Sequence, residues 1–133
     1  MNKASVFLWY KSGAEAAARF YADTFPGQCT VVSSNPMATE FILFGIPCTG
    51  LNGGPDYSQS PAFSFQVTTE TQEETDKYWQ ALTDDGGESG RCGWCKDRWG
   101  ISWQIIPRAL SQGLSDPDFD VRERVQAAMM RMD

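Results

Sequence analysis

Residues 6–21, VFLWYKSGAEAAARFY, decide the fold of this chain. The first five, Val6–Tyr10, are β-branched or aromatic, which is typical of a strand, and Lys11-Ser12-Gly13 end it. The following Ala14–Tyr21 is rich in strong helix formers, and its apolar side chains recur at helical spacing. A strand followed directly by an amphipathic helix predicts a sheet with a helix packed on one face.

Three short strand-like runs follow this helix in the first half of the chain. They are Cys29–Ser33, Glu40–Phe44 and Pro47–Leu51, and turn-forming residues separate them. Asn52-Gly53-Gly54-Pro55 then opens a loop. The order strand, helix and three strands predicts a first βαβββ module over about residues 1–55.

The second half repeats this plan. Phe63–Val67 alternates apolar and polar residues, as a half-buried strand does. Thr71 and Glu74 have the spacing of a capping box and open a helix that Gly86-Gly87 ends. Strand-like runs follow at Cys92–Lys96 and Ile101–Ile106. We therefore predict an α+β fold, residues 1–133 forming one domain whose second βαβββ module spans about residues 60–107.

The tail, residues 108–133, differs from both halves. Acids in Asp116–Asp120 favour a helix N-terminus. The amphipathic C-terminal helix predicted after them carries one apolar stripe, formed by Val121, Val125, Ala128, Met129 and Met132. This stripe either packs on its own domain or covers a partner subunit.

Composition excludes several classes of partner. The chain has 133 residues and a net charge of −6, which argues against a nucleic-acid binder because such proteins need a basic surface. It has no apolar run near the roughly 18–20 residues that span a bilayer, so we expect no membrane partner. The start leads straight into Val6–Tyr10, so we expect no signal peptide, a cytoplasmic location and reduced cysteines.

Taken together, several segments resemble one family. The chain resembles the PhnB-like branch of the glyoxalase/bleomycin resistance/dihydroxybiphenyl dioxygenase (vicinal oxygen chelate) superfamily, whose members often carry the label 3-demethylubiquinone-9 3-methyltransferase. The segments that carry the resemblance are Phe7–Tyr10, Ala14–Ala17, Phe20-Tyr21, Leu51–Pro55, Gln72–Trp79, Cys92–Trp94 and Lys96–Pro107. The resemblance implies a curved mixed sheet with a cleft between the modules, helices on the outer face, and a homodimer.

Metal-dependent relatives place four His or Glu ligands on the first, fourth, fifth and eighth strands. The resemblance carries these positions onto Val6, Cys48 or Gly50, Ala62 and Gln104. Valine and alanine cannot coordinate, and the sequence has no histidine, so we expect neither a family-type metal site nor a cofactor. A rearranged site that uses Gln104, Cys48 and water is the alternative.

The cysteine pair Cys92 and Cys95 has the C-x-x-C spacing of zinc or redox sites. A zinc site normally needs a second pair or histidines, and redox pairs usually start a helix rather than a strand. Buried structural thiols are therefore the favoured interpretation.

Strand alternation and the resemblance together propose an uncharged cleft that binds a small molecule. Ser64 and Gln66 line it from the fifth strand and Ser102 and Gln104 from the eighth. The residues expected from the first module are Leu8, Tyr10, Cys48 and Asn52. The alternative is that Gln66 and Gln104 only hydrogen-bond each other across the sheet.

Four basic residues near the last hairpin have two interpretations. Arg91, Lys96, Arg98 and Arg108 either anchor a carboxylate or phosphate, or form a solvated rim. The rim interpretation, which we favour, pairs them with the acids Asp84, Asp85, Glu88 and Asp97.

Three functions stay open at this point. The first is a dimeric, metal-free protein that binds a small neutral or aromatic molecule, with no catalytic residue assigned. The second is an enzyme with a rearranged metal site or a metal-free polar pocket. The third is a structural dimer whose cleft is filled by aromatic side chains such as Trp94 or Tyr10. The methyltransferase label finds little support, because the Gly-Gly pairs Gly53-Gly54 and Gly86-Gly87 do not lie between a strand and a helix.

Overall fold

The computed structural model of the chain describes residues 3–114 and 117–130. By its internal contacts the chain divides into two units, Met1–Gln59 and Ser60–Asp133, and each unit contains one four-stranded sheet. Among the helices of these described ranges, none is long and apolar enough to cross a membrane.

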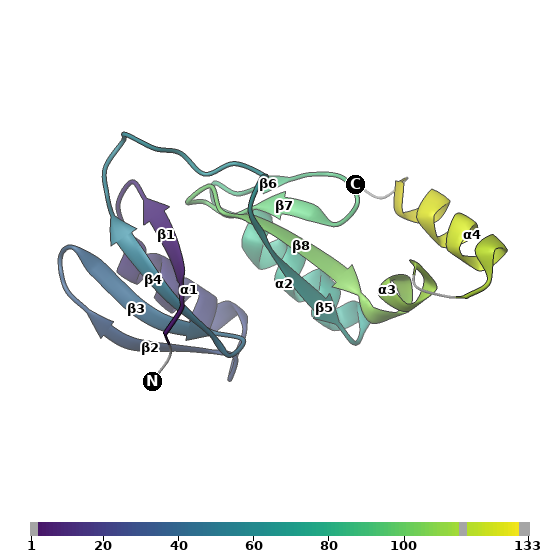
Figure 1. Cartoon of the computed structure of the whole chain (residues 1–133), viewed down its shortest axis with the longest axis horizontal. Coiled ribbons are helices and arrows are strands. Elements are labelled where there is room, and N and C mark those ends of the chain that lie inside the picture. The colour runs from purple at the N-terminus through teal and green to yellow at the C-terminus, as the bar shows by residue number, and fades with distance from the viewer. Residues whose placement is uncertain (1–2, 115–116, 131–133) are drawn as a thin grey trace. The chain divides into compact units, whose positions relative to one another are not determined.

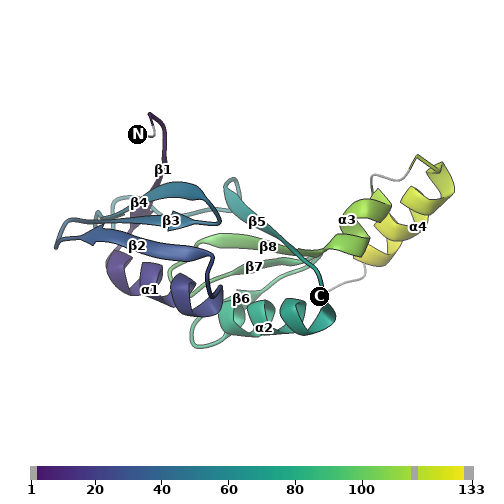
Figure 2. The same cartoon turned by 90° about the horizontal axis from the view of Figure 1, so that it is seen from below.

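The first unit follows directly from the opening stretch of sequence. Strand β1 (Val6–Tyr10) leads into helix α1 (Ala14–Thr24), and β2 (Cys29–Ser34), β3 (Ala38–Leu43) and β4 (Ile46–Asn52) follow. The strand order is β1-β4-β3-β2, with β1 parallel to β4 and the other pairs antiparallel (Figure 1). Helix α1 packs on one face of this sheet (Figure 2).

The second unit has the same topology. Its elements are β5 (Ser64–Thr69), α2 (Gln72–Thr83), β6 (Glu88–Ser89), β7 (Trp94–Lys96) and β8 (Ser102–Pro107). The strand order is β5-β8-β7-β6, with β5 parallel to β8 and the other pairs antiparallel. The predicted α+β fold with two βαβββ modules is confirmed.

The two long helices begin in different ways. Thr71 caps α2, since its hydroxyl accepts a hydrogen bond from the Glu74 backbone N–H at 3.1 Å, as the capping-box spacing predicts. Helix α1 is preceded by Gly13, which has a left-handed φ of 79° and no side chain to cap the helix. The side-chain Oδ1 of Asn52, at the end of β4, instead accepts a hydrogen bond from the Ala14 N–H at 2.8 Å.

The region between α2 and β8 differs from the sequence prediction. The expected strand over Cys92–Lys96 begins only at Trp94, because Cys92 and Gly93 have φ values of 59° and 83°, in the left-handed region. These two residues form a turn that returns the chain from β6, a two-residue strand that the sequence analysis did not predict.

One acid of the proposed rim is misplaced by the sequence analysis. Asp97, expected among solvated charges, is only 2% exposed and lies beneath the β7–β8 turn. Its Oδ1 accepts hydrogen bonds from the Trp99 and Ile101 backbone N–H groups, and its Oδ2 accepts one from the Trp103 indole N–H. The carboxylate can be buried because these three N–H donors hydrogen-bond to it, and the same bonds hold the turn together.

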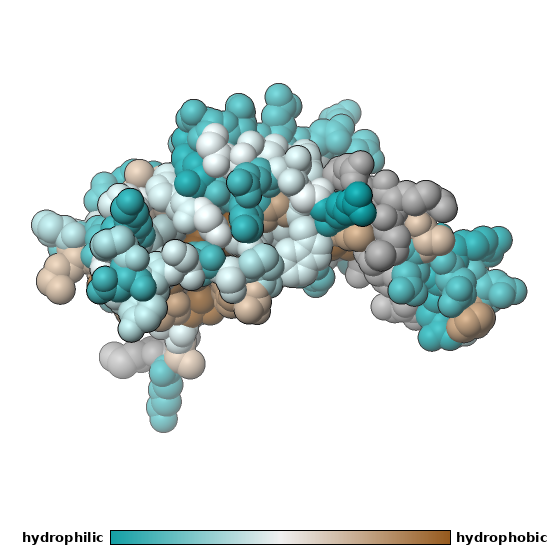
Figure 3. Space-filling model, turned by 90° about the horizontal axis from the view of Figure 1, so that it is seen from above, coloured by the Kyte–Doolittle hydropathy of each residue, from teal (hydrophilic) through white to brown (hydrophobic). Residues whose placement is uncertain are grey.

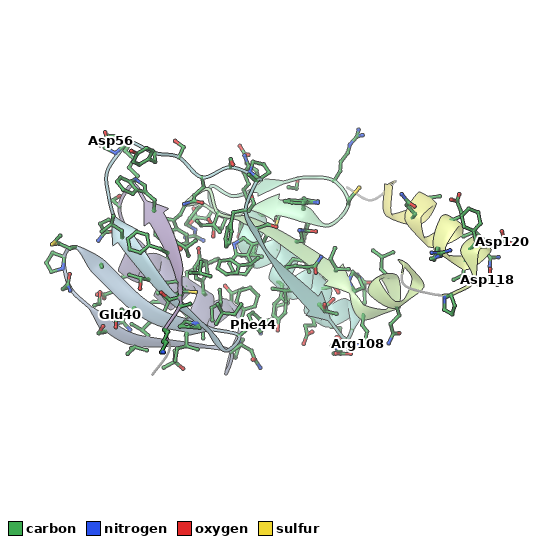
Figure 4. The ribbon with its side chains drawn as sticks, in the orientation of Figure 1. Glu40, Phe44, Asp56, Arg108, Asp118 and Asp120 are labelled. Atoms are coloured by element: carbon green, nitrogen blue, oxygen red, sulfur yellow. The ribbon has the colours of Figure 1, made fainter. Side chains whose placement is uncertain are left out.

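Two helices complete the second unit, α3 (Arg108–Leu114), which the sequence analysis did not predict, and α4 (Phe119–Met130). Helix α3 packs on β5 and β8, and α4 packs on α3. The predicted acidic start is confirmed, because Asp118 Oδ1 accepts a hydrogen bond from the Asp120 N–H (Figure 4).

The apolar stripe predicted for the tail is described only in part. Val121 is half-buried, whereas the side chains of Val125, Ala128 and Met129, and all of Met132, lie outside the described part of the chain. In Figure 3, most of the described side chains of α4 that face the viewer are hydrophilic.

Candidate functional site

The open face of the second sheet carries a row of polar side chains. The parallel register pairs Ser64 with Ser102 and Gln66 with Gln104, so all four side chains lie on the face that α2 does not cover. Gln104 Nε2 donates a hydrogen bond to Ser64 Oγ at 2.9 Å, and Gln66 Nε2 donates a longer one of 3.4 Å to Gln104 Oε1. The predicted face is therefore correct for these residues, and the cross-sheet hydrogen bond of the alternative interpretation also forms.

A hollow of about 320 Å³ opens on this unit beside the polar row. Its walls come from the segment before β5, from β6, the β6–β7 turn and β7, and from the start of β8. The residues that line it are Pro61, Glu88, Ser89, Gly90, Arg91, Trp94, Cys95, Lys96 and Ser102. Of the predicted site residues, only Ser102 lines this hollow.

The turn between β6 and β7 positions the wall of the hollow. Gly90 N–H donates to the Trp94 carbonyl and Trp94 N–H donates to the Arg91 carbonyl, each at 2.9 Å. A side chain at Gly90 would place its Cβ 2.9 Å from the carbonyl oxygen of Trp94, so this position requires glycine. The turn holds Trp94 on the open face, where it pairs in register with Gln104.

Ser102 is the deepest polar group of the hollow. It is 2% exposed, and its Oγ has no hydrogen-bond partner among the described residues. The register of β7 and β8 pairs Ser102 with Lys96, so both side chains lie on the same face. A buried hydroxyl without a partner is unfavourable, and a ligand that hydrogen-bonds it would remove that cost.

The hollow carries charges of both signs at its rim. Arg91 and Lys96 supply two cations and Glu88 supplies one carboxylate. The cross-strand register places Glu88 opposite Lys96, yet neither side chain forms an ion pair within the described residues. Among the described residues that line the hollow, two are cations and one is an acid, in a chain whose net charge is −6.

The thiol that lines the hollow cannot act as a nucleophile at neutral pH. Burial, with the Asp97 carboxylate nearby, raises the pKa of Cys95 to about 12. The thiol stays protonated, which agrees with the structural role favoured for it.

Two of the four basic residues near the hairpin form surface ion pairs. Arg98 contacts Asp85 at 3.0 Å, as the rim interpretation predicts. Arg108, at the start of α3, contacts both carboxylate oxygens of Glu70, and this pairing lowers the pKa of Glu70 (Figure 4). Arg91 and Lys96 line the hollow.

The residues predicted from the first module lie on the wrong face. Leu8, Tyr10 and Cys48 are at most 3% exposed, and the Tyr10 hydroxyl hydrogen-bonds Tyr21 of α1 at 3.1 Å. Asn52, in register with Tyr10, bonds the start of the same helix. Alternation groups residues by face, but it does not say which face the helix covers.

The open face of the first sheet carries the residues that alternate with these along β1 and β4. Phe7 and Trp9 of β1 lie on it, in register with Thr49 and Leu51 of β4, and Phe7 is 61% exposed. Val6, the position on β1 onto which the resemblance carries a metal ligand, belongs to the other set, in register with Cys48.

The residues present do not fit a divalent ion of the family type. Of the positions that the resemblance carries over, Val6 and Ala62 cannot coordinate, Cys48 is buried, and Gln104 offers only a neutral amide oxygen, which is a weak ligand. Across residues 3–114 and 117–130, no three His, Cys, Asp or Glu side chains converge into a group that could hold a metal.

The predicted cleft residues include only Ser102 of these walls, although the sequence also offered Arg91 and Lys96 as an anion anchor and Trp94 as a side chain that fills the cleft. Trp94 and Lys96 enter the hollow because β7 pairs with β8, and Glu88 enters it because the two-residue strand β6 pairs with β7. Alternation in Trp94-Cys95-Lys96 was the available signal, since it places Trp94 and Lys96 on the face of Ser102.

Comparison with known proteins gives consistent neighbours. The family model described as 3-demethylubiquinone-9 3-methyltransferase matches residues 2–106. The PhnB protein from Bacillus cereus is 28% identical with a TM-score of 0.68, over 80% of this chain and 99% of that one. No curated protein matches the sequence.

Two more distant structures share the fold. A glyoxalase/bleomycin resistance protein from Albidiferax ferrireducens has a TM-score of 0.57 at 13% identity, over 80% of this chain and 100% of that one. The fosfomycin resistance protein FosX from Listeria monocytogenes has a TM-score of 0.56 at 13% identity, over 79% of this chain and 89% of that one.

Proposed function

Because this chain belongs to the 3-demethylubiquinone-9 3-methyltransferase family, in the PhnB-like branch of the glyoxalase/bleomycin resistance superfamily, we propose that it binds a small molecule. The proposed site is the open face of the second sheet. The observation that carries the proposal is the hollow of about 320 Å³ beside the polar row of β5 and β8.

The size and composition of the hollow support this function. Small-molecule sites commonly occupy about 300–1,000 Å³ and combine apolar walls with a few polar groups. Here Pro61, Gly90 and Trp94 supply apolar surface, and Ser102 and Lys96 supply hydrogen-bond donors. A hollow of this volume fits a molecule of about one or two rings.

Binding without a family-type metal ion is part of the proposal. The positions that the resemblance assigns to a metal hold poor ligands, so the chain's own side chains must supply the recognition. Catalysis by a rearranged metal site is the competing function. A divalent ion that stays bound at one equivalent after gel filtration, measured by elemental mass spectrometry, would favour it.

The methyltransferase named in the family description is a weaker candidate. Enzymes that bind nucleotide-type cofactors commonly use a glycine-rich turn between a strand and a helix of an open parallel sheet. Each sheet here has a single parallel pair, and Gly53-Gly54 follow β4 whereas Gly86-Gly87 follow α2.

Titration of the ¹⁵N-labelled full chain with small one-ring and two-ring aromatic fragments tests the proposal. We expect at least one fragment to shift the backbone amide signals of β6, β7 and the start of β8. Trp94→Ala should weaken that binding about tenfold, because the indole is the one aromatic side chain among the described residues that line the hollow. Met37→Ala, which removes a side chain 70% exposed in the first unit, is the matched control and should bind normally.

The polar row is tested in the same titration. Gln104→Leu and Gln66→Leu should weaken binding if the ligand extends from the hollow along β5 and β8, and unchanged affinity in both would place the row outside the site. If no fragment shifts the amides of β6 to β8, the proposed function is wrong. The homodimer implied by the resemblance stays a prediction, which the mass in solution from light scattering checks.

A further inference from the structure

We infer that the hollow takes a planar molecule with a carboxylate group, whose oxygens accept hydrogen bonds from Ser102 Oγ and Lys96 Nζ. This inference rests on the proposed function and adds the chemical class of the ligand. It follows from three features of the described residues: an unpaired hydroxyl, the cationic side chain of Lys96 beside it, and an aromatic wall.

The hydroxyl of Ser102 indicates a hydrogen-bonding partner that comes from outside the protein. It is the only buried side-chain N or O atom without a partner in the described residues, although Ser64 and Gln104 on the same face are paired. Buried hydroxyls are normally satisfied by protein or water. Because the hydroxyl can donate, an oxygen of a bound carboxylate satisfies it.

The charges of the rim select an anion. Lys96 lies on the same face as Ser102 and beside it in register, and Arg91 also lines the hollow. Glu88, the one acid, is on the short strand β6 and is exposed, whereas Lys96 is half-buried. A carboxylate near Lys96 gains a charge-assisted hydrogen bond, whereas a ligand cation would meet the like charge of Lys96.

The wall of the hollow favours a flat ring attached to that carboxylate. Trp94 is half-buried on the open face, and Pro61 and Gly90 add surface without long side chains. Flat rings pack well against an indole. A ring that contacts Trp94 with its carboxylate toward Ser102 and Lys96 uses all three features.

Three matched probes test the inference: benzoate, the neutral benzamide and the cationic benzylamine. Each is titrated into the ¹⁵N-labelled full chain, and the dissociation constant comes from the shifts of the β6–β8 amides. We expect benzoate to bind about tenfold more tightly than benzamide, benzylamine to bind more weakly still, and added salt to reduce the difference.

The variants separate binding from folding. Lys96→Gln should weaken benzoate about fivefold or more and leave benzamide unchanged. Lys11→Gln makes the same change of charge on an exposed residue of the first unit and should alter neither. Glu88→Gln should tighten benzoate, because it removes the like charge.

Ser102→Ala gives the sharpest readout. The variant should lose affinity for benzoate, while its melting temperature stays unchanged or rises, because the hydroxyl has no protein partner to lose. A merely structural serine would lower the melting temperature instead.

The outcomes distinguish this inference from the proposed function. Equal affinity for benzoate and benzamide, or binding of benzoate that Ser102→Ala and Lys96→Gln both leave unchanged, would overturn the acid specificity and leave the binding function standing. Absence of binding by all three probes and by the fragments above would overturn both.

Discussion

At the scale of single residues, Asp97 shows how one buried carboxylate fixes a turn. It accepts hydrogen bonds from two backbone N–H groups and one indole N–H, all between 2.9 and 3.0 Å. The two carboxylate oxygens satisfy these three N–H donors, which would otherwise lack a partner inside the turn. The turn they hold joins β7 to β8, and thereby sets Lys96 and Ser102 side by side at the hollow.

Asp97→Ala should lower the free energy of unfolding by about 3 kcal/mol or more, because three donors, two of them buried, lose their acceptor. Trp103→Phe removes only the indole donor and should cost about 1–2 kcal/mol. Urea unfolding of both single variants and the double variant measures their coupling. A loss below about 1 kcal/mol for Asp97→Ala would show that the network does not stabilise the fold.

At the scale of elements, α1 is joined to its sheet by a residue distant in sequence. Asn52, at the end of β4, accepts a hydrogen bond from Ala14 N–H and donates one to the Pro36 carbonyl. The amide thus links the helix start, the β2–β3 turn and the last strand of the first unit. Its role is to cap the helix, which explains why it faces α1 and not the open face of the sheet.

Asn52→Ala should destabilise the chain by about 1–2 kcal/mol, the usual cost of losing a helix cap. Asn52→Asp keeps the acceptor for Ala14 and adds a negative charge at a helix N-terminus but loses the donor to the Pro36 carbonyl, so it should restore part of the loss. Thermal unfolding followed by circular dichroism compares the two. Equal destabilisation by both variants would contradict the capping role.

At the scale of the whole molecule, both units bury protonated thiols. Burial raises the pKa of Cys29 and Cys48 in the first unit to about 11, and that of Cys95 in the second to about 12. In the unfolded chain such thiols have a pKa of about 8.5. Above that value the unfolded chain releases protons that the folded chain keeps.

The stability of the chain should therefore fall as the pH rises from about 9 toward 11–12, since a raised folded-state pKa stabilises only while the thiol stays protonated. Chemical unfolding at pH 7, 9 and 10 measures this. Cys48→Ala should show a shallower decline than the wild type, and Ile105→Val, a core variant without a titrating group, should keep the wild-type slope. Identical slopes in all three proteins would show that the thiols do not contribute.

How much could be read from sequence depends on the range of the interactions involved. Val6–Tyr10, the helix formers after Gly13 and the Thr71 cap act through neighbours in sequence, so both βαβββ modules were predictable. The polar row on β5 and β8 was predictable for the same reason, because alternation grouped Ser64 with Gln66 and Ser102 with Gln104.

The sequence by itself determined the fold class, the repeat and the sets of residues that share a face. Only the tertiary structure decided which face α1 covers, and it turned Leu8, Tyr10, Cys48 and Asn52 toward the helix. Only the pairing of β7 with β8 brought Lys96 and Trp94 beside Ser102, and only the pairing of the two-residue strand β6 with β7 added Glu88. The physical reason is that periodicity is a local property of the chain, whereas burial and hydrogen-bond satisfaction depend on contacts between residues far apart in sequence.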